Sequence, residues 1–341
     1  AVVNAAEALT AILTIVELVE VFVESDGFPV ALSSFEHFAS SQPACVAVFH
    51  MLSVVLSDKN MDHVDLMITS DGIENLTLPI QSHNEDKELV AASLDVAAKS
   101  CVSDMWSGTL AVMDLPVAVL DTLKKWKEEP TVVSPCLVIL ACAGQEMDTV
   151  ATLVENGIYE VTMDALKTHK LNEEVCKGVL LVLHRLTDMD DTDKGMALLA
   201  KQSAVDLLID VISEYMEDHE LVVEAVNVIV NLVANNEVAP LFLNVPAFET
   251  IAQLISKYAE DESILSVVLR ILNFIKYVDA DCVLRIQTHF LDVYARLLDV
   301  HKDKLDTVKE VLALAEAMTE HTDACVEAFP NFIPAVIGCH E

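Results

Sequence analysis

Apolar side chains recur every three or four residues through long stretches of this chain, and each stretch ends at a short polar break. That spacing matches one face of an α-helix, whereas a half-buried strand would alternate every two residues. Three breaks share one phrase: VESDGF at Val23–Phe28, ITSDGI at Ile68–Ile73 and LVENGI at Leu153–Ile158. The pattern predicts amphipathic helices, and the glycine of each phrase is expected to end one helix in the left-handed conformation that a helix C-terminus favours.

The breaks return at a nearly constant distance along the chain. The small or polar residues before each apolar restart are Gly27, Gly72, Asp114, Gly157, Ser203, Pro246, His289 and Asn331, at intervals of 45, 42, 43, 46, 43, 43 and 42 residues. A period in the low forties is typical of solenoids whose repeats contain two or three helices. Glycine is expected where the turn most needs a positive φ, and other residues serve elsewhere.

The stretch from about residue 149 to residue 191 shows the plan of one repeat. DTVATLVENG predicts a short helix that Gly157 ends, and IYEVTMDALKTH predicts a second helix. LNEEVCKGVLLVLHRLTD predicts a longer third helix with Asn172 as its N-cap. Pro135, inside the third helix of the preceding repeat, predicts a kink or a late helix start. At the N-terminal end, VVNAAEALTAILTIVELVEVFV is predicted as one amphipathic helix.

The pattern LVENGIYEVTMDAL…NEEVCKGVLLVLHRLTD resembles the armadillo repeat, whose units contain a short first helix, a glycine break and two longer antiparallel helices. The resemblance covers essentially the whole chain. It implies an all-α fold, a right-handed armadillo-type α-solenoid of about seven three-helix repeats plus partial terminal repeats, in one superhelical domain over residues 1–341. The expected repeats are 1–18 (partial), 19–62, 63–104, 105–148, 149–191, 192–235, 236–280, 281–323 and 324–341 (partial).

The resemblance also implies a binding surface, because the third helices of such solenoids line a concave groove that holds extended peptides or partner domains. Two successive positions of each third helix are expected to face this groove: Phe49 and Ser53, Asp95 and Lys99, Leu137 and Ala141, Leu180 and His184, Asn227 and Asn231, Leu269 and Asn273, and Ala313 and Ala317. The predicted partner-binding residues are Leu180, His184, Arg185, Asn227, Asn231, Leu269, Arg270 and Asn273.

Two kinds of armadillo groove provide a comparison for these rows. Nuclear-import receptors carry Trp at the first position and Asn at the second in many repeats, but here only Asn231 and Asn273 follow that rule and neither tryptophan lies in the rows. The resemblance to an import receptor therefore fails at the residues that would perform its function. Catenin-type grooves are lined with Lys and Arg. Here Arg185 and Arg270 either hold a carboxylate or a peptide backbone, or they pair with local carboxylates and support the superhelix.

The charge balance narrows the choice of partner. The chain has 20 basic and 55 acidic residues, which gives a formal net charge of −35. A nucleic-acid backbone or an anionic membrane surface would be repelled by that field, whereas a basic protein partner would be attracted. The alternative is that most carboxylates only solvate the helix faces. No run of about 18 uncharged apolar residues is present, so direct membrane insertion is not expected.

No phrase typical of nucleotide binding, serine hydrolysis or metalloprotease chemistry occurs, so neither a catalytic residue nor a cofactor is expected. The segments DMDDTD at Asp188–Asp193 and EHTDAC at Glu320–Cys325 contain metal-ligand residue types, but both are interpreted as solvated turns and no metal site is predicted. The 8 cysteines form no CxxC pair, and several lie in apolar segments as small buried side chains. A reducing compartment is expected, namely the cytoplasm, with the nucleus as an alternative.

These observations favour a non-enzymatic scaffold or adaptor that binds a partner segment on the groove of third helices. The alternatives are a regulator that clamps a folded partner, such as an Hsp70 nucleotide-exchange factor or a small-GTPase exchange factor, and an import-type receptor for basic peptides. The apolar helix at the N-terminal end has no cap, so either residues precede Ala1 or another chain covers that end. The sequence leaves the partner and the oligomeric state open.

Overall fold

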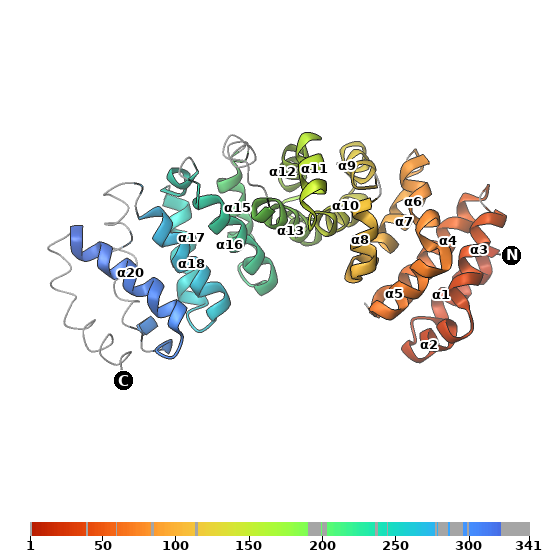
Figure 1. The fold of residues 1–341 in the computed structure, drawn as a ribbon, viewed down its shortest axis with the longest axis horizontal. Helices are drawn as coiled ribbons and strands as arrows, with labels where there is room; N and C mark the ends of the chain where they lie inside the picture. Colours follow the sequence, from red (N-terminus) through yellow and green to blue (C-terminus); the bar gives the residue numbers. More distant parts are fainter. Residues whose placement is uncertain are drawn as a thin grey trace. The chain divides into compact units, whose positions relative to one another are not determined.

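The computed structural model describes residues 2–38, 40–58, 60–82, 85–112, 115–189, 199, 203–235, 238–243, 245–276, 278, 286, 296–298 and 300–321. These residues form helices and turns and no strand (Figure 1). The chain divides into two compact units, Ala1–Met189 and Asp190–Glu341, and each is described by itself. The predicted all-α solenoid is confirmed, while the number of repeats stays a prediction.

The first unit contains successive groups of three helices, each ending in its longest member (Figure 1). After α1 (Val2–Ile12), the groups are α2 (Val16–Glu24), α3 (Gly27–Phe38) and α4 (Gln42–Val55); α5 (Met61–Met67), α6 (Ile73–Ser82) and α7 (Lys87–Lys99); α8 (Asp104–Val112), α9 (Leu115–Lys125) and α10 (Pro130–Ala143); and α11 (Met147–Glu155), α12 (Ile158–His169) and α13 (Glu173–Met189). Short 3₁₀ turns follow α4 and α7, and a π-helical turn, η2 (Ile68–Gly72), joins α5 to α6. This is the predicted three-helix plan.

The second unit follows the same plan where it is described. Its elements are α15 (Ala204–Glu214), α16 (His219–Val233), the 3₁₀ helix η4 (Ala239–Leu243), α17 (Val245–Lys257), α18 (Glu262–Ile275) and α20 (Leu305–His321). Much of the expected repeat 281–323 and all of the expected last segment, 324–341, lie outside the described residues.

The last helices of successive groups, called the third helices below, pack on one another. In the first unit α1 contacts α4, α4 contacts α7, α7 contacts α10, and α10 contacts α13. In the second unit α16 contacts α18, and α18 contacts α20. Helix α10, for example, buries Val133, Leu137 and Leu140. Stability therefore comes from interfaces between neighbouring repeats, as expected for a solenoid.

Polar contacts between neighbouring repeats confirm the period in the low forties. They join residues near the start of one third helix to residues near the start of the next. Each of the following pairs is separated by 42 residues: Lys87 with Glu129, Lys127 with His169, Met216 with Tyr258, His219 with Asp261, and Ala259 with His301. Residues that contact at a constant separation occupy equivalent places in a stacked array.

The predicted single helix at the N-terminal end is wrong, because the chain turns between Ile12 and Val16. Ile15 is extended, with φ −93° and ψ 113°, and Leu13 is only 3% exposed. The physical reason is packing: α1 lies against α4 as a third helix does, whereas α2 contacts α3 as the first helix of the next group. One straight helix could not satisfy both contacts, and the burial of Leu13 helps to stabilise the turn.

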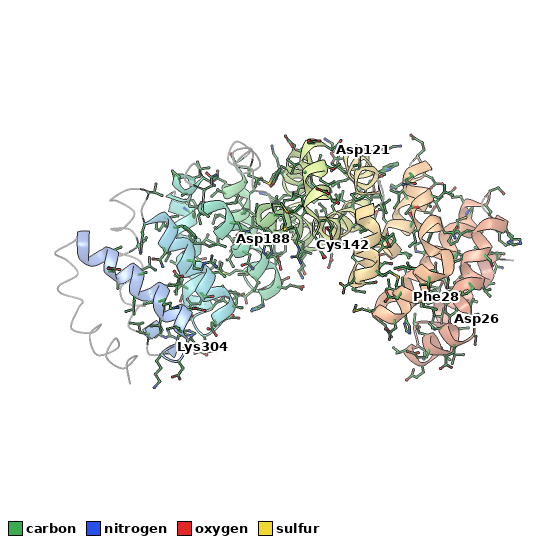
Figure 2. All side chains as sticks on the ribbon, viewed as in Figure 1. Asp26, Phe28, Asp121, Cys142, Asp188 and Lys304 are labelled. Atoms are coloured by element: carbon green, nitrogen blue, oxygen red, sulfur yellow. The ribbon has the colours of Figure 1, made fainter. Side chains whose placement is uncertain are left out.

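The expected positive φ is found at Gly157, where φ is +81°, but not at Gly27 or Gly72. At the first break Asp26 adopts the left-handed conformation instead, with φ 56°, just before Phe28 enters the core (Figure 2). A Cβ on Gly27 would lie 2.5 Å from the carbonyl oxygen of Phe22, and one on Gly72 would lie 2.6 Å from that of Met67. Close backbone approach, rather than backbone conformation, requires glycine at these two positions.

Candidate functional site

A groove of about 710 Å³ crosses the N-terminal halves of three consecutive third helices in the first unit. Its lining comprises His50 from α4, Lys87, Glu88, Ala91, Ala92 and Asp95 from α7, Pro130, Thr131, Ser134 and Pro135 from α10, and Asn172 and Glu174 at the start of α13. Since α7 packs on α10 and α10 on α13, these residues form one continuous surface. The third helices therefore do provide a groove, which includes the predicted row residue Asp95, while its residues on α10 and α13 lie nearer the N-termini than the predicted rows.

The charges that line the groove are mostly negative. Lys87 Nζ lies 3.0 Å from Glu129 Oε2, so this cation is already paired. Glu88 and Glu174 are exposed and make no ion pair or hydrogen bond among the residues that the structure describes. Two carboxylates thus remain open to a ligand.

Pro135 removes one backbone hydrogen bond from α10 next to the groove. Helix α10 begins at Pro130 and continues through Pro135, so the late helix start considered from the sequence is wrong. Proline has no backbone N–H and cannot donate to the carbonyl of the residue four positions earlier. The carbonyl of Thr131 therefore lacks its helical partner, and Thr131 and Pro135 both line the groove.

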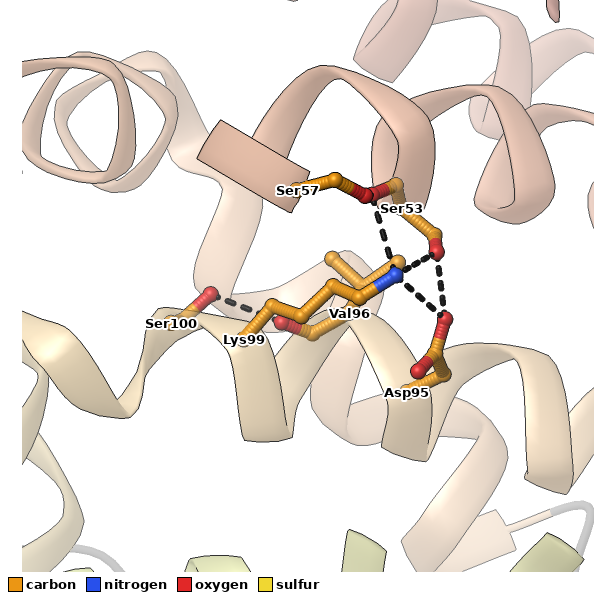
Figure 3. A network of polar contacts seen from close by, with 6 residues as sticks. All are labelled: Ser53, Ser57, Asp95, Val96, Lys99 and Ser100. Carbon is orange, nitrogen blue, oxygen red and sulfur yellow. Dashed lines mark hydrogen bonds and ion pairs between the residues drawn. The ribbon is translucent and has the colours of Figure 1, made fainter. Parts of the chain in front are cut away.

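Three predicted row residues form a polar network between α4 and α7 (Figure 3). Lys99 Nζ donates to the backbone carbonyl of Ser53 at 3.1 Å and lies 3.2 Å from Asp95 Oδ2. The Ser53 hydroxyl also hydrogen-bonds to Asp95. The polar groups of these three side chains join two repeats, and only Asp95 among them also lines the groove.

Leu180 and Leu269 do not line a groove, and the prediction for these two residues is wrong. Both side chains are 0% exposed. Leu180 lies on α13, which packs on α10, and Leu269 lies on α18, which packs on α16 and α20. Their apolar character fits these interfaces, where they stabilise the fold by removing apolar surface from water.

The remaining predicted residues lie on two different units. His184 is half-buried and Arg185 is exposed on α13 in the first unit. Asn227 and Asn231 are half-buried on α16, and Arg270 is exposed on α18, in the second unit. Within the described parts of the chain Arg185 and Arg270 make no ion pair, so the interpretation that they pair with local carboxylates gains no support there.

Asn273 joins two third helices of the second unit. Its side-chain amide donates to the backbone carbonyl of Glu310 at 3.0 Å and to Glu310 Oε2 at 2.7 Å. Its side-chain carbonyl accepts from Lys276 Nζ at 2.7 Å, and the same amine donates to the carbonyl of Ala313. Both N–H donors of Asn273 are therefore used within the fold.

Sequence reasoning missed His50, Glu88, Thr131, Ser134 and Glu174. The signal was present, because Glu88, Thr131 and Glu174 are spaced by one repeat length of 43 residues and each is the second residue of its helix. The predicted rows instead lie nearer the middle of each helix, where Leu137, Leu180 and Leu269 are buried.

Most of the described cysteines behave as small core side chains, and Cys101 is half-buried. Cys136, Cys142 and Cys176 are buried, as predicted, while Cys282 lies outside the described residues. Burial raises the pKa of the Cys136 thiol well above its ordinary value. A hydrogen bond to Cys142, together with burial, raises the pKa of Cys101. These two thiols are consequently protonated at neutral pH and poor nucleophiles.

Neither a metal site nor a membrane-spanning helix is found among the described residues. Among them no group of three or more His, Cys, Asp or Glu side chains is arranged to hold a metal ion. Most of DMDDTD and EHTDAC lies outside the described residues. None of the described helices combines the length and the apolar character that crossing a bilayer requires.

A second hollow, of about 390 Å³, lies among α1, α2, α3 and Met51 of α4. Large apolar side chains line it, and several are well exposed, including Ile12 at 47%, Val21 at 54% and Val30 at 67%. The apolar surface expected at this end of the chain is therefore present.

No protein-family model matches the chain. No curated protein matches it either. Among solved structures the chain is similar to one described as "A conserved phosphorylation switch controls the interaction between cadherin and beta-catenin in vitro and in vivo", with a TM-score of 0.72 and 14% identity over 93% of this chain and 60% of that one. It is also similar to an engineered protein, with a TM-score of 0.62 and 15% identity over 99% of this chain and 95% of that one. At these identities the likeness shows a shared helical repeat fold.

Proposed function

We propose that this chain is a non-enzymatic, armadillo-type scaffold or adaptor that binds a segment of a partner protein on the third helices of its first unit. The observation that supports this most is the groove across α7, α10 and α13, where Glu88 and Glu174 are open to a ligand. The likeness to a structure of a cadherin and β-catenin study agrees with a role in protein binding. The protonated, buried thiols fit work in a reducing compartment such as the cytoplasm.

The proposal is tested by filling the groove. Ser134→Trp places a large side chain in the groove, whereas Asp164→Trp adds the same side chain to an exposed position of α12. Full-length protein with either substitution is purified from its source cells with its bound proteins. We expect partners of the unmodified protein to be lost with Ser134→Trp and retained with Asp164→Trp.

The opposite pattern, with partners retained by Ser134→Trp, would remove the groove from the proposal. Circular dichroism of both variants shows whether each keeps its helical content, so a loss of folding is recognised separately. A chaperone or GTPase domain recovered in place of a peptide-like segment would favour a regulator of folded partners.

A further inference from the structure

Two cysteines from consecutive repeats meet beside the C-terminal ends of α7 and α10. Cys101 lies in the 3₁₀ turn η3 (Ser100–Val102) that follows α7, and Cys142 lies in the last turn of α10 (Figure 2). A hydrogen bond joins their side chains. Helix α10 packs against both α7 and η3, so the stacking of two repeats brings together two sulfur atoms that are 41 residues apart in the sequence.

The two thiols differ in their access to solvent. Cys101 is half-buried, and its thiol donates to the carbonyl oxygen of Ala97 at 3.5 Å. Cys142 is buried. A small oxidant that diffuses to this end of α7 therefore meets Cys101 first, with the second thiol in contact behind it.

A buried indole group lies next to the same pair. Trp106 of α8 is 0% exposed, and its Nε1 atom has no hydrogen-bond partner of ordinary geometry among the described residues. The hydrogen bond to Cys142 and burial raise the pKa of Cys101, while the Trp106 indole acts in the opposite direction and lowers it. A buried donor without an acceptor is costly, and an oxygen added to the Cys101 sulfur would supply an acceptor.

We infer that Cys101 and Cys142 form an oxidation-sensitive pair, which a peroxide converts into a disulfide between two consecutive repeats. In the first step the Cys101 sulfur attacks hydrogen peroxide and the O–O bond breaks, which gives Cys101 sulfenic acid and water. In the second step the Cys142 sulfur attacks the sulfenic sulfur and the S–O bond breaks, so that the hydroxyl leaves as water with the proton of Cys142. Two thiols thus lose two electrons and two protons, which reduce one peroxide to two waters.

The position of the pair determines what its disulfide does. Polar side chains join α4 to α7, where Lys99 donates to the carbonyl of Ser53. The disulfide would join α7 to α10 covalently and stabilise the first unit, because a cross-link restricts the unfolded chain. Since Cys101 is protonated at neutral pH, the first step is slow and the reduced pair persists until peroxide accumulates. Disulfides of this transient, redox-sensing kind are the ones found in reducing compartments.

Peptide mapping by mass spectrometry tests the pairing in the unmodified full chain. Reduced protein is treated with a small molar excess of hydrogen peroxide, alkylated, digested and compared with a sample returned to dithiothreitol. We expect a linked peptide that joins Cys101 to Cys142, while the buried Cys45 and Cys136 stay thiols. The absence of this linked peptide, or Cys101 linked to another cysteine in its place, would overturn the inference.

The disulfide is also expected to raise the melting temperature by roughly 5–10 °C. Dithiothreitol should reverse the rise, which separates it from methionine oxidation because sulfoxides need dedicated enzymes for their reduction. Cys142→Ala should abolish the rise, whereas Cys45→Ala, which removes a buried thiol outside the pair, should retain it. An equal rise in both variants would contradict the proposed cross-link, and the mapping of the unmodified chain decides the question if Cys142→Ala does not fold.

The order of the two steps is tested with dimedone, which labels sulfenic acids. We expect Cys101 to be labelled in peroxide-treated Cys142→Ala and several-fold less in the unmodified chain, because a neighbouring thiol held in contact captures the sulfenic acid first. Equal labelling of Cys101 in the two proteins would show that Cys142 does not capture it and would overturn the inference.

Discussion

Gly27 and Gly157 both lie at helix boundaries, yet they are glycine for different physical reasons. Gly157 has a φ of +81°, which the phrase LVENGI indicated. The close approach of Gly27 to Phe22 depends on how α2 packs on α3 and is invisible in the sequence. Local rules thus predicted the backbone conformation at one site, while tertiary packing determined the other.

Alanine substitutions distinguish Gly27, which has close neighbours, from Gly108, which has free space around it. Gly27→Ala is expected to lower the free energy of unfolding by at least about 1–3 kcal/mol, because an added Cβ would overlap Phe22. Gly108 lies inside α8 with nothing within 4 Å of an added Cβ. Gly108→Ala is therefore expected to raise the free energy of unfolding by about 0.5–1 kcal/mol. Urea unfolding measures the free energy of unfolding of both variants, and changes of the same sign in Gly27→Ala and Gly108→Ala would contradict this account.

The elements were easier to predict than their burial. The third helix α13 begins after Asn172, whose side chain accepts from the N–H of Val175 at 3.1 Å, as the N-cap signal indicated. Apolar periodicity located the buried face but did not fix which polar residues flank the groove. Leu180 was consequently assigned to the wrong face, since a register error of one residue moves a side chain by about 100° around a helix.

The N-cap of α18 should make stability depend on pH. Asp261 Oδ1 accepts from the N–H of Ser263 at 3.0 Å and of Ile264 at 3.4 Å, and Oδ2 lies 2.6 Å from His219 Nε2. Burial raises the pKa of Asp261, but hydrogen bonds from Ser263 and His219 outweigh it and hold the pKa below its usual value. With a lower pKa in the folded state, this stabilisation is complete above the unfolded value and is lost as pH falls through the folded value.

Asp261→Ala is therefore expected to lower the free energy of unfolding by about 1 kcal/mol at neutral pH. The difference from the unmodified protein should shrink as the pH falls below about 4. The neighbouring exposed Glu260 provides the control, since Glu260→Ala removes a carboxylate that does not cap a helix. If the free energy of unfolding of Asp261→Ala stays lower than that of the unmodified protein by the same amount down to strongly acidic pH, the ionised cap has no such role.

At the scale of the whole molecule, stability comes from contacts between neighbouring repeats. Asn273→Ala removes hydrogen bonds between α18 and α20 and leaves Glu310 without two of its donors. We expect a loss of about 1–3 kcal/mol, with faster amide exchange in α20 and unchanged exchange in α4 and α7, because coupling in a solenoid passes between neighbours. Equal acceleration everywhere would indicate a single cooperative core instead.

The net charge of −35 is also a property of the whole chain. Like charges repel in the compact state, and salt screens that repulsion. The melting temperature is therefore expected to rise as sodium chloride increases from low to physiological concentration. A fall in the melting temperature would mean that ion pairs such as Lys87–Glu129 outweigh the repulsion.

The repeat period and the all-α fold could be predicted from the sequence because both follow from the spacing of apolar residues. The groove could not, since it depends on how successive third helices pack on one another and on which charges find partners in the next repeat, such as Lys87 with Glu129. These details arise from packing between residues more than forty positions apart, which no local pattern records.

Site-specific photo-crosslinking tests the central claim most directly. A photoreactive amino acid is placed in the full chain at His50 or Ser134, which line the groove, or at Asp121 or Asp164, which lie on exposed faces of α9 and α12. The account predicts that a partner protein is captured from the groove positions and not from the other two. Capture confined to Asp121 and Asp164 would contradict it.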